Sequence, residues 1–330
     1  MRTVRFDAFG GMPYVAEVPM PAAAAGGAVI RVEAAGLCRS DWHGWQGHDP
    51  DIPSLPHIPG HEFAGVVHAV GDGVRRVRVG DRVVVPFICG CGECAWCVSG
   101  SAQVCPNQWQ PGFHGPGCYG EFAAIPWADF NLVALPGGLP FEVAASLGCR
   151  FATAYRGIVD VAGVRAGEWV AVFGCGGVGL AAVMIARSRG ARVIGIDVNG
   201  RALALATQAG AESTVDASTG DPVEMIRAVV PHGVDVAVDA LGSAGTAGGA
   251  TRSLRITAAI CRSASCHRRR SVIMPPSPCT WSSAVNSAST AATAWRLPTT
   301  RACSPTSPPG CLIPHSSSRA RSPSAMHPVR

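Results

Sequence analysis

Four cysteines in one short stretch of the sequence have the spacing of a metal site. They follow the pattern C-x2-C-x2-C-x7-C and are Cys91, Cys94, Cys97 and Cys105. Four thiolates at such spacing can close a tetrahedral zinc site, which stabilises a loop and leaves no coordination position open. Cys89 could compete with Cys91, and Cys118 is spare. The cysteines alone leave an iron–sulfur or redox cluster open as the alternative.

A glycine-rich turn between a predicted strand and a predicted helix could bind a dinucleotide. Its G-x-G-x-x-G pattern follows the apolar residues 169–173 and consists of Gly174, Cys175, Gly176, Gly177, Val178 and Gly179. The glycines allow a tight turn and let backbone amides approach a pyrophosphate at the helix N-terminus. A small packed side chain is the preferred interpretation of the cysteine, over a reactive thiol.

Asp197 directly follows the next predicted strand, residues 192–196, and its carboxylate indicates which dinucleotide is preferred. A carboxylate here would bond both ribose hydroxyls and repel a 2′-phosphate, so NAD is favoured over NADP. Arg201 lies nearby and weakens this preference slightly.

Three further segments, far apart in the chain, contain cysteine or histidine. They are residues 36–43 (GLCRSDWH), 60–62 (GHE) and 147–150 (LGCR). In order and spacing they resemble the catalytic zinc site of medium-chain zinc alcohol dehydrogenases, a resemblance that extends from residue 1 to about 255. Two cysteines and a histidine are the zinc ligands of alcohol dehydrogenase. The resemblance therefore implies that Cys38, His61 and Cys149 bind a catalytic zinc with its fourth position open.

The same resemblance assigns roles to residues beside these ligands. Ser40 and His43 match the family's relay, which moves the proton of the alcohol through hydroxyl, ribose and imidazole. Asp41 matches the carboxylate that orients the histidine ligand. Arg39 falls where the family places a cation on the cofactor pyrophosphate. Glu62 neighbours the zinc. The implied reaction is hydride transfer between NAD and a small alcohol, or its aldehyde or ketone, with two zinc ions per chain.

Apolar patterning predicts an α/β protein in which two domains position these residues. Residues 1–150 are rich in Gly and Pro and carry short alternating runs, at 28–32, 65–70 and 82–85, typical of an irregular β domain. The resemblance identifies it as a GroES-like catalytic domain. In residues 151–255, strands alternate with helices, the latter at 178–189 and 201–208, and 235–239 is a further strand. This alternation indicates a doubly wound parallel sheet, an incomplete Rossmann domain that binds NAD.

Residues 256–330 form a tail whose composition differs from the rest of the chain. Fifteen Ser and ten Pro accompany a single Gly, without periodicity, which indicates disorder. We interpret the tail as a product of a shifted reading frame near Arg255, because back-translation in another frame restores segments similar to those of the family. A sheet truncated after its fourth or fifth strand lacks elements that close the nicotinamide pocket and, in the family, join subunits into oligomers. An inactive remnant that keeps zinc and perhaps NAD is therefore the alternative function.

Charge and hydropathy argue against two other classes of partner. The net charge is +5, but the tail holds nine Arg and no acid, whereas the remainder has 18 Arg against 22 acids. A mildly acidic folded part disfavours nucleic acid. The N-terminus lacks the apolar core of a secretory signal, and the apolar run 169–186 contains the glycine turn, so no membrane span is expected. We expect a cytoplasmic enzyme with a small-molecule alcohol or aldehyde substrate.

Overall fold

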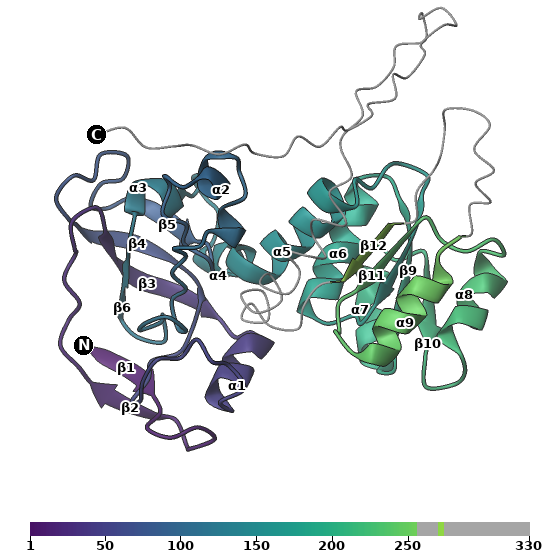
Figure 1. Ribbon diagram of the computed structural model, residues 1–330, viewed down its shortest axis with the longest axis horizontal. Coiled ribbons are helices and arrows are strands. Elements are labelled where there is room, and N and C mark those ends of the chain that lie inside the picture. The colour runs from purple at the N-terminus through teal and green to yellow at the C-terminus, as the bar shows by residue number, and fades with distance from the viewer. Residues whose placement is uncertain (256–269, 274–330) are drawn as a thin grey trace, which may run out of the picture.

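The computed structural model describes residues 1–255 and 270–273 and contains two five-stranded sheets (Figure 1). The first sheet is antiparallel, with the strand order β6 (Phe122–Ile125), β3 (Ala28–Gly36), β4 (Glu62–Val70), β5 (Arg82–Val85) and β7 (Val133–Ala134). A separate antiparallel pair joins β1 (Arg2–Arg5) and β2 (Tyr14–Glu17). Alternate side chains of β5 and of β6 are buried, as expected for strands with one face on a core, whereas the first three residues of β3 are all buried.

Short helical segments surround the antiparallel sheet. They are α1 (Arg39–Trp45), α2 (Ala95–Val98), η1 (Ala102–Val104), α3 (Ala128–Asn131) and α4 (Phe141–Ala145). Helix α1 begins directly after Cys38, whose backbone N–H donates to the Asp41 carboxylate at 2.9 Å. The acceptor satisfies an N–H that no helical carbonyl can reach, so it fixes the start of the helix.

A continuous helical stretch leads from the antiparallel sheet to the second sheet (Figure 1). It consists of η2 (Leu147–Phe151), α5 (Ala152–Tyr155) and η3 (Arg156–Val161). Both η2 and η3 are wide, π-helical turns, a geometry that often marks functional sites. Cys149 lies in η2 and is buried.

The second sheet is parallel, with the strand order β10 (Ser213–Asp216), β9 (Arg192–Asp197), β8 (Trp169–Phe173), β11 (Val236–Asp239) and β12 (Arg270–Ile273). Its helices are α6 (Gly177–Ser188), α7 (Gly200–Gln208), α8 (Pro222–Val229) and α9 (Ala244–Ser253). From β8 the chain continues to one side through β9 and later returns to the other through β11. Ligands of open α/β sheets bind at such a switch point, beyond the carboxyl ends of the strands.

Both faces of the parallel sheet are covered by helices, and each face has its own hydrophobic core. Val170 and Val172 of β8 contact buried residues of α6 and α7. Ala171 and Phe173, the alternate residues, belong to the cluster that includes buried residues of α8 and α9. A strand buried on both sides reads as an unbroken apolar run, which explains the sequence of β8.

The structure confirms the predicted fold class, with an antiparallel β part and a doubly wound parallel sheet. Strand β12 lies within the segment that was expected to be disordered and pairs in register with β11. The remainder of that segment, residues 256–269 and 274–330, lies outside the described residues. The domain boundaries at 150 and 255 and the frame-shifted origin of the tail stay predictions.

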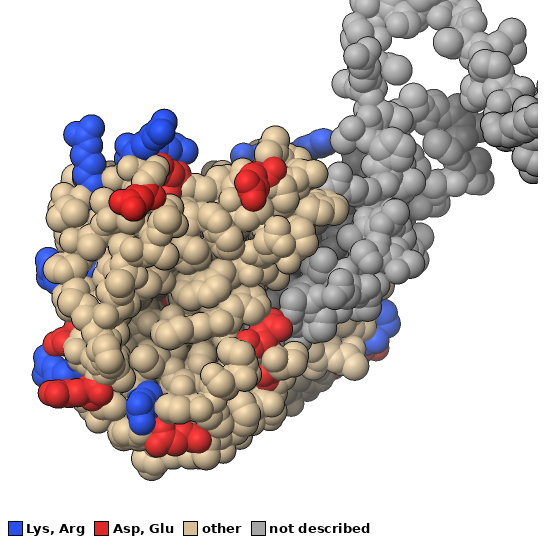
Figure 2. Space-filling model, turned by 60° about the vertical axis from the view of Figure 1, so that its left-hand side comes forward, with Lys and Arg blue, Asp and Glu red and all other residues tan. Residues whose placement is uncertain are grey.

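The surface charge of one face and the hydropathy of the helices bear on the expectations about partners, which stay predictions. Figure 2 shows acidic and basic side chains interspersed around the rim of one face, with uncharged side chains between them. Among the described residues on this face, the basic side chains do not form the single-sign stripe that binds nucleic acid. Within the described residues, no helix combines the length and apolar character that crossing a membrane requires.

Candidate active site

Cys38, His61 and Cys149 come from three elements and meet in one place. Cys38 precedes α1, His61 directly precedes β4, and Cys149 lies in η2. Together with Glu62, each offers one potential ligand atom, and these four atoms all lie within 4.8 Å of one another. His61, Glu62 and Cys149 are buried, and Cys38 is half-buried. The structure thus brings together the three residues that were predicted as ligands of the catalytic zinc.

The ring of His61 is oriented by Asp41. Its Nδ1 lies 2.9 Å from Asp41 Oδ1, whereas Nε2 is buried and has no hydrogen-bond partner among the described residues. The other carboxylate oxygen accepts hydrogen bonds from the Cys38 backbone N–H and from the Tyr119 hydroxyl, both at 2.9 Å. A buried nitrogen without a partner is costly unless a ligand satisfies it. Nε2, beside two sulfurs, therefore fits a metal ion.

The electrostatics of the cluster also suit a cation. The hydrogen bond with the Cys149 thiol, opposed by burial, lowers the pKa of Cys38 to about 4. The same bond raises the pKa of Cys149 well above its ordinary value, and burial raises it further. Burial disfavours the charged form of His61, but the Asp41 carboxylate outweighs it and raises the pKa of His61 to about 10. A divalent ion could stabilise both thiolates in the place of these protons.

Ser40 and His43, the predicted proton relay, lie on the first turns of α1, and each has a different neighbour among the described residues. Ser40 is buried, with its hydroxyl 3.7 Å from the Cys38 sulfur. His43 is half-buried, and its Nδ1 lies 3.1 Å from Nδ1 of His48. The expected relay passes through a ribose hydroxyl between serine and histidine, so it does not need a direct bond between them.

Glu62 is fully buried beside the cluster and is paired with Arg150. The Arg150 Nε and Nη2 atoms lie 2.9 Å and 2.6 Å from the two carboxylate oxygens, and the backbone N–H of Arg150 donates to Glu62 Oε1 at 3.1 Å. This planar, two-pronged geometry is the strong form of the ion pair.

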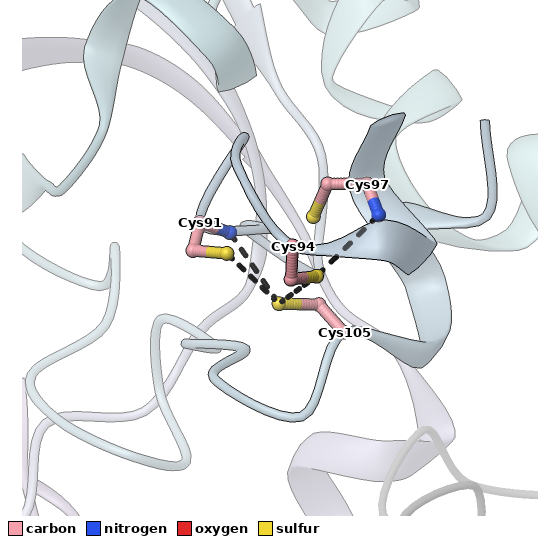
Figure 3. A group of neighbouring side chains, drawn as sticks. All are labelled: Cys91, Cys94, Cys97 and Cys105. Atoms are coloured by element: carbon pink, nitrogen blue, oxygen red, sulfur yellow. Dashed lines mark hydrogen bonds between the residues drawn. The ribbon is translucent and has the colours of Figure 1, made fainter. Parts of the chain in front are cut away.

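The four clustered cysteines form a second group of potential ligands. Their sulfurs point toward one another, and all lie within 4.8 Å of each other (Figure 3). Cys105 Sγ lies 3.6 Å from the sulfur of Cys91 and 3.7 Å from that of Cys94. Backbone N–H groups of the loop lower the pKa of Cys91 to about 6. Cys89 lies outside this group and is fully buried, which raises the pKa of its thiol.

The glycine-rich turn connects β8 to α6. Gly174 has φ +89°, a conformation that L side chains rarely adopt. A Cβ on Gly179 would lie 1.8 Å from the Gly174 carbonyl oxygen, so α6 approaches the turn after β8 more closely than any other residue would allow. A Cβ on Gly176 would meet no atom of the described residues within 4 Å, so they leave this side of the turn open. The turn therefore fits a pyrophosphate at the N-terminus of α6.

Asp197 and Arg39 occupy different positions relative to this turn. Asp197, at the end of β9, accepts the backbone N–H of Cys175 at 2.7 Å and that of Asn199 at 2.9 Å. It therefore touches the glycine-rich turn, and its role toward a ribose stays a prediction. Arg39 is exposed, and its guanidinium lies 4.5 Å from the ring of Trp42, in a cation–π contact.

Two residues of this region were not predicted from the sequence. Tyr119 bonds Asp41 and the Gly36 carbonyl, but nothing in the sequence near it indicates that role. Arg150 directly follows Cys149 in the LGCR motif, so the sequence placed it near the cluster. The sequence did not indicate its pairing with Glu62.

Comparison with known proteins agrees with this geometry. A family model described as an alcohol dehydrogenase GroES-like domain matches residues 24–137, and one described as a zinc-binding dehydrogenase matches residues 177–290. An alcohol dehydrogenase of Geobacillus stearothermophilus is 39% identical over 214 residues, which are 64% of this chain and 63% of the relative. One of Rhizobium meliloti (strain 1021) is 37% identical over 252 residues, 72% of this chain and 73% of the relative. The chain thus spans somewhat less than two thirds of the first of these relatives.

A solved structure shows the same likeness in three dimensions. Alcohol dehydrogenase TADH from Thermus sp. ATN1 superposes with a TM-score of 0.75 at 31% identity. The superposition covers 87% of this chain and 88% of that one.

Proposed function

Since the chain belongs to the family of zinc-dependent medium-chain alcohol dehydrogenases, we propose that it transfers a hydride between NAD and a small alcohol, or its aldehyde or ketone. The observation that carries the proposal is the convergence of Cys38, His61 and Cys149, with the unpartnered Nε2 of the histidine beside two sulfurs. Two thiolates and an imidazole are a ligand set that leaves one position of a tetrahedral zinc site free for substrate.

Each group near this cluster has a defined part in the proposed reaction. When bound, zinc supplies a Lewis acid that lowers the pKa of an alcohol hydroxyl, and NAD supplies the hydride acceptor. Asp41 holds the proton on His61 Nδ1, so that Nε2 is free to act as a ligand. Ser40 and His43 take the proton of the alcohol toward solvent.

The proposal includes two zinc ions per chain and a preference for NAD. The second zinc would be held by the four clustered cysteines, with no substrate position, and would stabilise their loop. The preference for NAD rests on Asp197, whose carboxylate touches the turn where the dinucleotide would bind and would repel a 2′-phosphate.

Turnover of the full chain tests the proposed function. The zinc-loaded protein is mixed with a panel of primary and secondary alcohols, and NADH or NADPH formation is followed. We expect NAD-linked turnover that is lost after chelation and in His61→Asn, but restored by zinc only in the unsubstituted protein. Zinc and NAD binding without turnover of any alcohol would favour an inactive remnant and would refute the proposal.

A further inference from the structure

Arg150 lies between the candidate metal cluster and the glycine-rich turn. It follows Cys149 in η2, and the Glu62 carboxylate accepts hydrogen bonds from its Nε and Nη2 atoms. The Nε and Nη2 edge of the guanidinium therefore binds the buried Glu62 carboxylate, which lies next to the potential zinc ligands.

The close packing around this ion pair leaves it little freedom. A Cβ on Gly36 would lie 2.5 Å from Glu62 Oε2 and 3.1 Å from Arg150 Nη2. A side chain at the end of β3 would therefore displace the carboxylate or the guanidinium, so the backbone of Gly36 closes this side of the pair. The Arg150 side chain nevertheless keeps 29% of its surface exposed, so part of it faces outward from the pair.

The other part of Arg150 contacts the first turn of α6. A Cβ on Gly177 would lie 2.6 Å from Arg150 Cδ and 3.3 Å from Nη1. Nη1 takes part in none of the hydrogen bonds within the part of the chain that the structure describes, although the other two guanidinium nitrogens do. A free N–H donor with a positive charge thus lies at the helix terminus where backbone amides would bind the pyrophosphate.

We propose that Arg150 is a positioning residue that binds the dinucleotide pyrophosphate through Nη1 while Nε and Nη2 hold Glu62 at the metal cluster. The inference rests on the proposed function, because it requires a dinucleotide at the glycine-rich turn. A planar guanidinium can bind two anions on different edges, which an ammonium cannot do. Arg150 would therefore link occupancy of the cofactor site to the position of the carboxylate beside the metal.

Binding of cofactor fragments to the full chain tests this role without any turnover. ADP-ribose, which contains the pyrophosphate, and adenosine, which lacks it, are titrated by calorimetry into the zinc-loaded protein and into Arg150→Gln. We expect the Kd for ADP-ribose to rise about tenfold or more in the variant, the effect of a lost charge-assisted hydrogen bond, and the Kd for adenosine to stay unchanged. Arg150→Lys keeps the charge and should retain part of the ADP-ribose affinity.

A matched substitution and the adenosine titration exclude a merely structural effect. Arg156→Gln makes the same chemical change six residues away, where the arginine forms a surface pair with Asp160 at 3.5 Å, and should bind both ligands as the unsubstituted protein does. Equal ADP-ribose affinity in Arg150→Gln, or an equal loss of adenosine, would overturn the inference while leaving the proposed function intact. Failure of the unsubstituted protein to bind ADP-ribose would instead refute the cofactor site itself.

Discussion

Replacing Asp41 by asparagine should disable His61 as a ligand without removing it. The carboxylate is buried and accepts three hydrogen bonds, from His61, from the Cys38 backbone and from Tyr119. An asparagine has only one acceptor oxygen. If this oxygen keeps the two donors on the Cys38 and Tyr119 side, the amide NH2 faces His61 Nδ1. That nitrogen must then accept, and the ring proton moves to Nε2, where it blocks a metal.

The expected loss of zinc affinity follows from the effect that hydrogen-bond partners of metal-bound histidines have on metal binding. Such changes weaken metal affinity about 10- to 100-fold, which corresponds to about 1.4–2.7 kcal/mol. Competition with a chromogenic chelator measures the affinity, and the cysteine cluster provides an internal reference that should not change. Tyr119→Phe removes one donor but keeps the carboxylate, so its effect should remain below about tenfold. Unchanged zinc affinity in Asp41→Asn, or an equal loss in both variants, would refute the tautomer argument.

Three further predictions concern the cofactor turn and the cysteine cluster. Gly179→Ala should lower the free energy of unfolding by about 1–3 kcal/mol in denaturant titrations, because its Cβ would lie 1.8 Å from a backbone oxygen. Gly137→Ala, with nothing within 4 Å, should change it by less than about 0.5 kcal/mol, and equal effects would contradict the packing argument. Asp197→Ser should reduce the ratio of kcat/KM with NAD to kcat/KM with NADP by about tenfold, because about 1.4 kcal/mol of repulsion between the carboxylate and the 2′-phosphate is lost. An unchanged ratio would contradict the role of Asp197 in the choice of cofactor. Chelation should expose the loop around Cys97 to proteolysis, and a loop that stays protected would argue against a zinc-stabilised cluster.

The parallel sheet and its glycine-rich turn could be predicted because their signals are local. Strand β8 was predicted with its observed ends, and α6 begins and ends within one residue of its predicted range. A strand buried on both faces, a glycine turn and an apolar helix follow one another directly in the sequence. Strands β1 and β2 were missed, since both have only four residues and β1 has a single buried residue and β2 none, so neither carries an apolar pattern.

The contacts around the candidate site could be predicted only in part. The three predicted ligands converge as the motif order implied, but this came from resemblance to a family and not from periodicity. Tyr119 is 78 residues from Asp41 in the sequence, and Arg150 is 88 residues from Glu62. Both contacts depend on how two sheets and a helical connection are arranged, which no local pattern specifies. Strand β12 was missed for a related reason: among the described strands it pairs with β11 alone, 31 or more residues earlier in the chain, and no local pattern indicates that pairing.

Zinc content tests the central claim most directly. The account predicts about two zinc ions per chain in the purified full-length protein, and about one in either Cys149→Ser or Cys97→Ser, because each substitution removes a ligand from a different site. Elemental analysis of the three proteins after dialysis against a weak chelator gives these values. A Cys149→Ser protein that still holds as much zinc as the unsubstituted chain would contradict the claim that Cys38, His61 and Cys149 bind one metal ion.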